Sequence, residues 1–247
     1  LKSLGFNIQS LKVRSALGSG TTEVSAEDGI RSTLRMGDSA LIVGEVRSTE
    51  ALALYEAMRV GALANVVAGT IHANDAYGVF DRVCNDLKVP ATSFKATDII
   101  LMARPLPYLG KRLTSITEVR KFWTEDPLKE RGFVDLVKFD YENDSLEPTD
   151  HLKNGDSDIL KEIGSRVDAF AGNWSAIWEN ILLRARVIQH LINKAYEIDE
   201  PELVRAAWYI KVMDAFRDIS NDVYEEIRGK TGVGAFPSDE IFRQWSH

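Results

Sequence analysis

The sequence predicts an α/β domain followed by an all-helical module. Short apolar runs alternate with amphipathic helical segments over residues 26–104, which is typical of βαβ units around a parallel sheet. From Asn154 onward no strand pattern remains, and only helical periodicity is found. We therefore expect an α/β domain over residues 1–150 and a helical module over residues 151–247.

Composition limits the class of protein further. The chain has 247 residues, of which 45% are hydrophobic and 27% charged, as in an ordinary globular protein. Its single cysteine, Cys84, excludes an intramolecular disulfide and a multi-cysteine zinc site. The formal net charge of −7 argues against a nucleic-acid partner held by bulk charge. No apolar run is long enough to span a membrane, and no basic-then-apolar leader opens the chain.

The opening segment, residues 4–14, has the pattern of a strand from the middle of a sheet. The first residue is Leu1 and not methionine. We therefore expect the natural chain to extend upstream.

The α/β domain is expected to alternate helices and strands. Ser25 is a favourable N-cap for a first helix, with Asp28 three residues later. Residues 40–44 form a continuous apolar run, which indicates a strand buried on both faces. The full expected series is helix 26–36, strand 40–44, helix 49–60, strand 65–71, helix 75–87 and a third apolar strand 98–104, stopped by Pro105 and Pro107.

The hydrophobic pattern changes in the segments after residue 104. Residues 113–123 and 133–141 alternate apolar and polar side chains, as antiparallel edge strands do. The helical module should contain helices at 156–170, 174–195, 201–227 and 238–245. Because the apolar stripe of the second of these helices covers one side only, we expect a compact bundle and not a membrane segment.

Most familiar catalytic patterns are absent from the sequence. The four histidines (His72, His151, His190 and His247) lack ligand spacing with one another, and there is no Gly-x-Ser-x-Gly or Gly-x-Gly-x-x-Gly motif. Residues 18–22 are glycine-rich but contain no lysine, and residues 229–231 follow a predicted helix where a phosphate loop must follow a strand. We therefore reject both segments as phosphate-binding loops.

Two polar residues end consecutive predicted strands. Glu45 follows the apolar run Ala40–Gly44, which is the geometry of a Walker B element, and His72 follows the next strand. Consecutive parallel strands end at the same edge of a sheet, so both side chains should share one rim. A structural ion pair between Glu45 and Arg47, and a histidine that only orders its loop, are the alternatives at this level.

These segments resemble the secretion ATPase superfamily. The run Ala-Leu-Ile-Val-Gly-Glu-Val-Arg at residues 40–47, then Glu50-Ala51, and Gly-Thr-Ile-His-Ala-Asn at residues 69–74 are similar to its Walker B strand and His box. Residues 90–100 resemble the archaeal branch. Members are hexameric motors of type II and type IV secretion, type IV pili and archaella. The resemblance covers residues 4–141 and implies the C-terminal part of a RecA-like P-loop ATPase domain.

The resemblance also implies roles for particular residues. Glu45 matches the Walker B glutamate, which holds Mg²⁺ through water, and His72 matches the histidine that senses the γ-phosphate. Four further matches, expected at the nucleotide or at a subunit interface, are Arg47, Glu50, Arg35 and Arg14. In the parent protein this implies ATP and Mg²⁺, a homo-hexamer, and a polytopic inner-membrane assembly protein as partner at the cytoplasmic face of the membrane.

One departure from the family decides what this chain should do alone. The Walker A loop and the Asp box precede the matching region in the family, and neither occurs in these 247 residues. We therefore expect the chain alone to bind no nucleotide tightly, while the parent hydrolyses ATP to drive secretion or filament assembly. The alternatives are a non-hydrolysing module whose helical part binds a membrane-embedded assembly partner, and an unrelated α/β domain in which Glu45 and His72 are structural.

Overall fold

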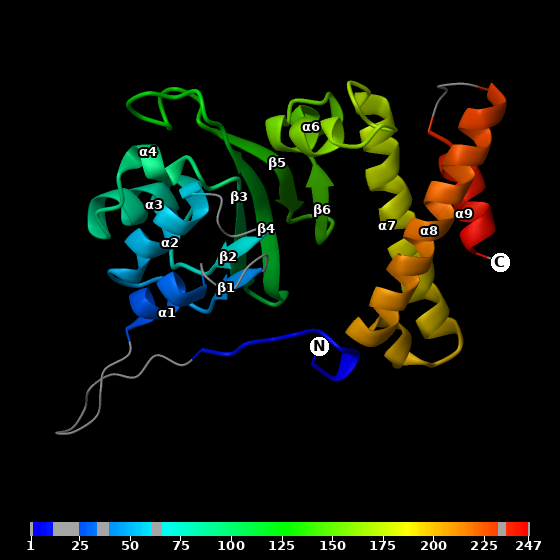
Figure 1. Ribbon diagram of the computed structural model, residues 1–247, viewed down its shortest axis with the longest axis horizontal. Coiled ribbons are helices and arrows are strands. Elements are labelled where there is room, and N and C mark those ends of the chain that lie inside the picture. Colours follow the sequence, from blue (N-terminus) through cyan, green and yellow to red (C-terminus); the bar gives the residue numbers. More distant parts are fainter. Residues whose placement is uncertain (1, 12–24, 34–39, 61–65, 232–235, 247) are drawn as a thin grey trace. The chain divides into compact units, whose positions relative to one another are not determined.

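The computed structural model describes residues 2–11, 25–33, 40–60, 66–231 and 236–246 (Figure 1). The chain divides into two compact units. Residues 10–156 form the sheet unit, which holds every strand of the described part. Residues 1–9 and 157–247 form the helical unit.

The parallel pair of strands in the sheet unit is short. Strand β1 (Leu41–Val43) pairs in parallel with β2 (Val67–Gly69), and Val43 lies opposite Gly69. Helix α2 (Glu50–Val60) makes the crossover between them, so the predicted strand–helix–strand order is confirmed. Both strands therefore end at the same edge of the sheet.

The helices before and after this pair begin with side-chain caps. Helix α1 (Ala26–Thr33) starts after Ser25, whose Oγ accepts the backbone N–H of Asp28 at 3.0 Å, as the sequence predicts. Helix α3 (Ala76–Asp81) starts after Asp75, whose Oδ1 accepts the N–H of Gly78 at 2.7 Å. A π-helical turn (Arg82–Asp86) extends α3, and the single turn α4 (Ala91–Phe94) follows.

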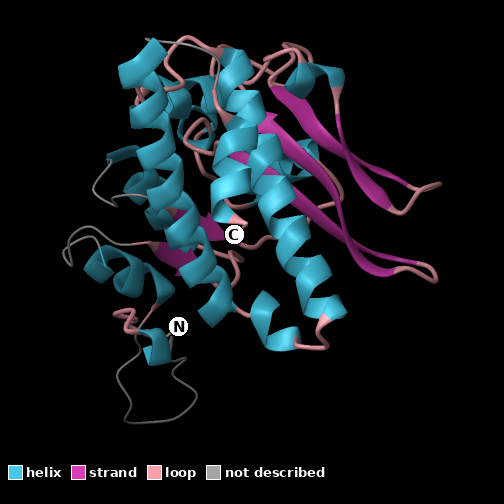
Figure 2. Cartoon of the chain, turned by 90° about the vertical axis from the view of Figure 1, so that its right-hand side faces the viewer, coloured by secondary structure: helices cyan, strands magenta, loops and turns pink. Residues whose placement is uncertain are grey.

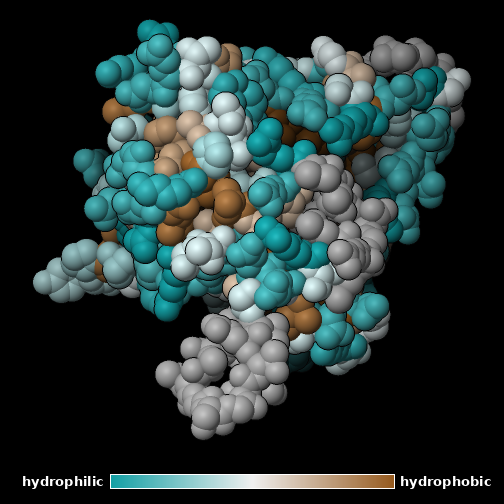
Figure 3. Space-filling model, turned by 60° about the vertical axis from the view of Figure 1, so that its left-hand side comes forward, coloured by the Kyte–Doolittle hydropathy of each residue, from teal (hydrophilic) through white to brown (hydrophobic). Residues whose placement is uncertain are grey.

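The prediction that β1 is buried on both faces is wrong. Ile42, the middle residue of the strand, is 77% exposed, while its neighbours Leu41 and Val43 pack against the core. Among the described residues β1 has one strand partner, and the apolar run alone could not show that only one of its faces is covered. Figure 3 shows apolar patches, in brown, between hydrophilic side chains on one face of the molecule.

The sequence suggested that the third apolar strand joins the parallel pair, but it does not. Strand β3 (Ile99–Leu106) runs through Pro105 and pairs antiparallel with β4 (Gly110–Val119). The strand tolerates Pro105 because it lies at the edge of its sheet, where a missing N–H costs no ladder bond. The sheet continues antiparallel through β5 (Phe133–Asp140) and β6 (Ser145–Pro148).

Aromatic rings form the centre of the sheet unit. Phe80 of α3 packs edge-on against Phe94 of α4 and against Trp123, with ring centroids 5.1 and 5.6 Å apart. Tyr55 of α2 stacks on Phe94. Each such buried side chain contributes about 1.5–3 kcal/mol, so these rings hold three helices against the segment that follows β4.

The opening segment is not a strand where the structure describes it. Lys2–Leu4 form a single 3-10 turn, and residues 5–11 have no regular structure. A strand requires a neighbour for its backbone hydrogen bonds, and none of the described strands pairs with this segment. The rest of the predicted strand, residues 12–14, lies outside the described residues.

The helical unit follows the predicted pattern, with the bounds of three of its four helices shifted. Its helices are α6 (Asp158–Ser165), α7 (Trp174–Glu197), α8 (Ala206–Thr231) and α9 (Ser238–Trp245), and the turn Pro201–Val204 precedes α8. Helix α9 packs against both α7 and α8 (Figure 2). The shared core consists mainly of Leu183, Val187, Phe216, Val223 and Ile241. In the described part of the chain, no helix is both long and apolar enough to cross a membrane.

Candidate functional site

The ends of β1 and β2 form a rim that carries Glu45 and His72. Backbone pairing continues past both strands, because the N–H of Val46 donates to the carbonyl of Thr70 at 2.8 Å and the Thr70 hydroxyl donates to the carbonyl of Gly44. The two loops are therefore held side by side. Glu45 Oε1 lies 3.4 Å from His72 Nε2, which confirms the prediction that these side chains share one edge.

The charges at the rim favour an anion next to the Glu45 carboxylate. Arg47 donates a side-chain hydrogen bond to Glu45 Oε2. This bond lowers the pKa of Glu45, assisted by the charges of Arg47, His72 and Arg82 and opposed by partial burial. Glu45 is therefore ionised at neutral pH. The His72 side chain is 81% exposed, so its ring is free to meet a ligand from solvent.

Glu50 accepts hydrogen bonds from backbone N–H groups next to the rim. Its Oε1 accepts the N–H groups of Arg47 at 2.6 Å and Ser48 at 2.9 Å. Burial raises the pKa of Glu50, but these backbone hydrogen bonds outweigh it and leave the pKa below its ordinary value. Glu50 thus fixes the turn that presents Arg47 at the start of α2. The other two matched positions, Arg14 and Arg35, lie outside the described residues.

Two arginines that the sequence reasoning missed hold the His-box loop. Arg82 donates to the carbonyl of His72 at 3.2 Å, and Arg104 of β3 donates to the carbonyl of Asn74. Neither arginine belongs to a motif, and Arg104 comes from the antiparallel sheet, 30 residues away in sequence. Of these two, Arg82 also lies near enough to Glu45 for its charge to help lower the pKa of that carboxyl.

The single carboxylate at the rim suits a cation whose other ligands are waters or substrate groups. In the part of the chain that the structure describes, no group of three or more His, Cys, Asp or Glu residues could hold a metal ion. Glu45 is a single carboxylate, and Mg²⁺ is commonly bound through one or two carboxylates together with waters and substrate phosphates. Glu45 could therefore serve as one such carboxylate.

Comparisons with known proteins find a matching family and two similar proteins. Residues 5–120 match the family described as "Type II/IV secretion system protein". Two proteins of Methanocaldococcus jannaschii are similar. Uncharacterized protein MJ1287 is 31% identical over 155 residues, which cover 61% of this chain and 53% of that protein. Uncharacterized protein MJ0900 is 28% identical over 177 residues, which cover 69% of this chain and 30% of that protein.

The aligned part of this chain thus spans about half of the first relative and under a third of the second. The matching segment contains both strands of the parallel pair and both rim residues, and it ends at Arg120, directly after β4. Residues 5–120, just under half of this chain, match the type II/IV secretion system protein family.

Proposed function

We propose that this chain is the C-terminal portion of a motor ATPase that couples ATP hydrolysis to protein secretion or filament assembly. The observation that carries the proposal is the contact between Glu45 and His72 across the ends of two parallel strands. The match to the family supports it. On this proposal the sheet unit is the C-terminal part of a RecA-like ATPase domain.

Mg²⁺–ATP, when bound, would supply the transferable phosphoryl group and the cation that neutralises its charge. The residues on the rim fit one side of such a ligand. The Glu45 carboxylate would orient a water on the cation, and the exposed His72 ring would contact the terminal phosphate. Arg82 and Arg104 would keep the His72 loop in place through its carbonyl groups.

The phosphate cradle must come from elsewhere. The 247 residues contain no Gly-x-x-x-x-Gly-Lys-Ser/Thr segment, which is the element that supplies backbone N–H groups and a lysine to the phosphates. We therefore propose that this chain alone binds Mg²⁺–ATP weakly. Calorimetric titration tests this, and micromolar affinity of the isolated chain would contradict it.

The catalytic proposal is tested in the protein that carries this chain together with a phosphate loop. Glu45→Gln should lower turnover by a factor on the order of 10²–10³, as for losing one group that stabilises charge in a transition state, because it removes charge near Mg²⁺ while nucleotide binding is kept. His72→Ala should lower turnover as well, because the contact with the phosphate is lost. Steady-state hydrolysis and binding of a fluorescent ATP analogue measure the two properties separately.

A matched control removes a carboxylate far from the rim. Glu147→Gln changes an exposed glutamate of β6, whose side chain accepts a hydrogen bond from the Ser145 hydroxyl. It should hydrolyse ATP at the wild-type rate. Unchanged turnover in Glu45→Gln would remove Glu45 from the mechanism, whereas a wild-type protein that hydrolyses no ATP would favour a non-hydrolysing interaction module.

The remaining family properties complete the proposal. The parent should assemble as a homo-hexamer and work at the cytoplasmic face of a membrane through a polytopic assembly protein. We place contact with that partner in the helical unit, whose excess of acidic residues disfavours direct adhesion to anionic lipid. Flotation of the chain with anionic liposomes in the absence of other proteins should therefore leave it in the unbound fraction.

A further inference from the structure

Exposed apolar side chains gather on the turn that joins α7 to α8 in the helical unit. This turn includes the last residues of α7, the short helix Pro201–Val204 and the first residues of α8 (Figure 2). Its exposed apolar and aromatic side chains, which we call the turn surface, are Tyr196 (84% exposed), Ile198 (59%), Val204 (46%), Trp208 (46%) and Tyr209 (38%). Single exposed apolar residues are normal, but a group of them marks an interaction site.

The backbone of the turn is held by hydrogen bonds. The N–H of Ile198 donates to the carbonyl of Lys194 at 3.1 Å. The N–H of Glu200 donates to the carbonyl of Ala195 at 2.9 Å, which closes the end of α7. The short helix Pro201–Val204 then packs against both α7 and α8. Because the backbone is ordered in advance, a partner that covers the turn surface has little chain entropy to overcome.

Two carboxylates on the turn carry negative charge that the described part of the chain leaves unpaired. Asp199 follows α7 with a positive φ of 53°, and Glu200 is the next residue. No described cation lies within ion-pair distance of either side chain. The other two acidic residues of the turn are each neutralised by a basic residue three positions away, at 2.7 and 2.9 Å, in the pairs Lys194–Glu197 and Arg205–Glu202.

An aromatic ring of the turn surface already attracts a cation. Lys211 Nζ lies 5.2 Å from the centre of the Trp208 ring. An aromatic face next to unpaired carboxylates favours lysine and arginine side chains, because both groups attract positive charge. The exposed apolar side chains require an apolar surface opposite them. Anionic lipid fits this combination poorly, because its headgroups would face Asp199 and Glu200.

We propose that the turn between α7 and α8 is a docking surface for a basic amphipathic segment of another protein. The apolar side of that segment covers Tyr196, Ile198 and Trp208, and its lysines or arginines pair with Asp199 and Glu200. Cytoplasmic loops of membrane proteins carry an excess of lysine and arginine, so a polytopic partner offers such segments. Assigning the segment to that partner rests on the proposed function, whereas the docking itself does not.

Docking is measured by fluorescence anisotropy with the complete chain and no nucleotide. The probe is a labelled amphipathic peptide of about 18 residues, with leucine on one helical face and lysine on the other. The chain should bind this peptide, and added salt should weaken the binding because the contact uses charge. A peptide with glutamate in place of lysine, or with serine in place of leucine, should bind about tenfold more weakly or less.

Two double variants locate the binding on the turn. Asp199→Asn with Glu200→Gln removes both unpaired charges, and asparagine tolerates the positive φ at residue 199. Tyr196→Ser with Ile198→Ser removes apolar surface. Each should weaken binding of the leucine–lysine peptide about tenfold. All four side chains are exposed, so both variants should fold, which circular dichroism checks.

Matched controls change the same chemistry elsewhere in the helical unit. Glu179→Gln with Asp222→Asn removes two carboxylates from α7 and α8. Ile163→Ser with Leu182→Ser removes two side chains that are 54% and 50% exposed on α6 and α7. Both control variants should bind the peptide with the affinity of the unchanged chain.

Four results would overturn the docking surface. They are no binding by the unchanged chain, full affinity in either turn variant, equal weakening by the matched controls, or binding to vesicles of phosphatidylcholine and phosphatidylserine that Tyr196→Ser with Ile198→Ser abolishes. The last result would make the turn a lipid contact. Because the titration contains no ATP, failure of the ATPase proposal leaves it intact, and failure of the docking leaves the role of Glu45 intact.

Discussion

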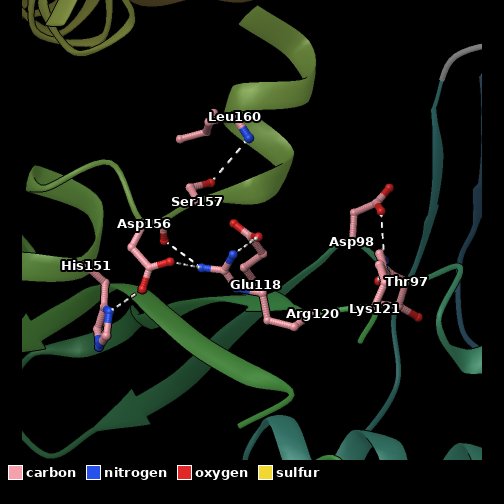
Figure 4. Close-up of polar contacts among 9 residues, drawn as sticks. All are labelled: Thr97, Asp98, Glu118, Arg120, Lys121, His151, Asp156, Ser157 and Leu160. Carbon is pink, nitrogen blue, oxygen red and sulfur yellow. Dashed lines mark hydrogen bonds and ion pairs between the residues drawn. The ribbon is translucent and has the colours of Figure 1, made fainter. Parts of the chain in front are cut away.

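The sheet unit contains two arginine–carboxylate clusters of the same chemistry and opposite exposure. At the rim, Arg47 holds Glu45 beside His72, and the arginine and histidine are mostly open to solvent. At the end of β4, Arg120 and Glu118 are almost completely buried and form, with Asp156, a buried cluster (Figure 4). Burial decides what each cluster can do. The rim can exchange its contacts for those of an anionic ligand, whereas Arg120 and Glu118 in the buried cluster are shielded from one.

The energetic contrast follows from desolvation. A charge held in the interior cannot be left alone, because water no longer compensates for a lost partner. An exposed carboxylate that loses its arginine is simply hydrated. Replacing the arginine by alanine should therefore lower the free energy of unfolding strongly in the buried cluster and hardly at all at the rim.

The largest expected effect is that of Arg120→Ala. It removes the guanidinium from Glu118 and Asp156 and should destabilise the chain by about 3–5 kcal/mol, as for other broken buried pairs. Arg47→Ala should leave the denaturation midpoint unchanged. Urea denaturation followed by circular dichroism measures both variants. Equal losses would show that burial does not distinguish the clusters.

Glycines near the two clusters extend the comparison to packing. The carbonyl of Gly132 accepts the N–H of Arg120, and a Cβ at Gly132 would lie 2.6 Å from Trp123 Cδ1 and 2.9 Å from Pro127 Cα. Gly132→Ala should therefore cost about 1–3 kcal/mol. At the rim, a Cβ on Gly44 would meet nothing within 4 Å, so Gly44→Ala should stay within about 0.5 kcal/mol of the parent chain. Thermal unfolding of the matched pair checks this, and a larger loss in Gly44→Ala would reverse the argument.

The rim could be predicted from the sequence and the buried cluster could not, for a physical reason. Glu45 and His72 each follow an apolar run, and the parallel crossover that such runs imply puts their strand ends together. Arg120 and Asp156 are 36 residues apart and meet only because the antiparallel sheet brings the chain back. Nothing in the local pattern of either residue indicates a partner.

The same limit explains the misplaced strand. An apolar run predicts that β3 is a strand, but its partner depends on what the chain does next. The turn after Leu106 contains Tyr108 and Gly110, both with positive φ, and returns the chain directly as β4. A tight hairpin makes an antiparallel neighbour, so β3 could not also follow the parallel crossover pattern. The role of Arg104 at the rim depends on this placement.

A third kind of carboxylate sharpens the comparison, because it is partly exposed and still accepts several hydrogen bonds. Glu130 accepts the backbone N–H groups of Glu125 at 2.7 Å, Thr124 at 2.9 Å and Asp126 at 2.8 Å, and these bonds lower its pKa to about 2. Its folded pKa lies below the unfolded value, so its stabilisation is complete above about pH 4.5 and is lost as the pH falls toward 2. Glu130→Gln should therefore unfold earlier than the parent chain at pH 7, and the difference should shrink at pH 2–3. Thermal scans at both pH values check this, and a pH-independent difference would show that charge is not the cause.

The smallest effect is a change of titration at the rim without a change of stability. Arg47 is the largest cause of the lowered pKa of Glu45, through its hydrogen bond and its charge. Arg47→Ala should therefore raise the pKa of Glu45 toward its ordinary value, while His72 and Arg82 keep part of the depression. At pH 7 the carboxylate stays ionised in both proteins, so the variant tests electrostatics alone. Carbon-detected NMR titration of the Glu45 Cδ resonance measures the shift. Arg31→Ala, which removes an exposed arginine paired with Glu27 on α1, should leave that titration curve in place. If both variants shift the pKa of Glu45 equally, the rim carries no specific arginine–carboxylate contact. The rim would then differ from the buried cluster only in general surface charge.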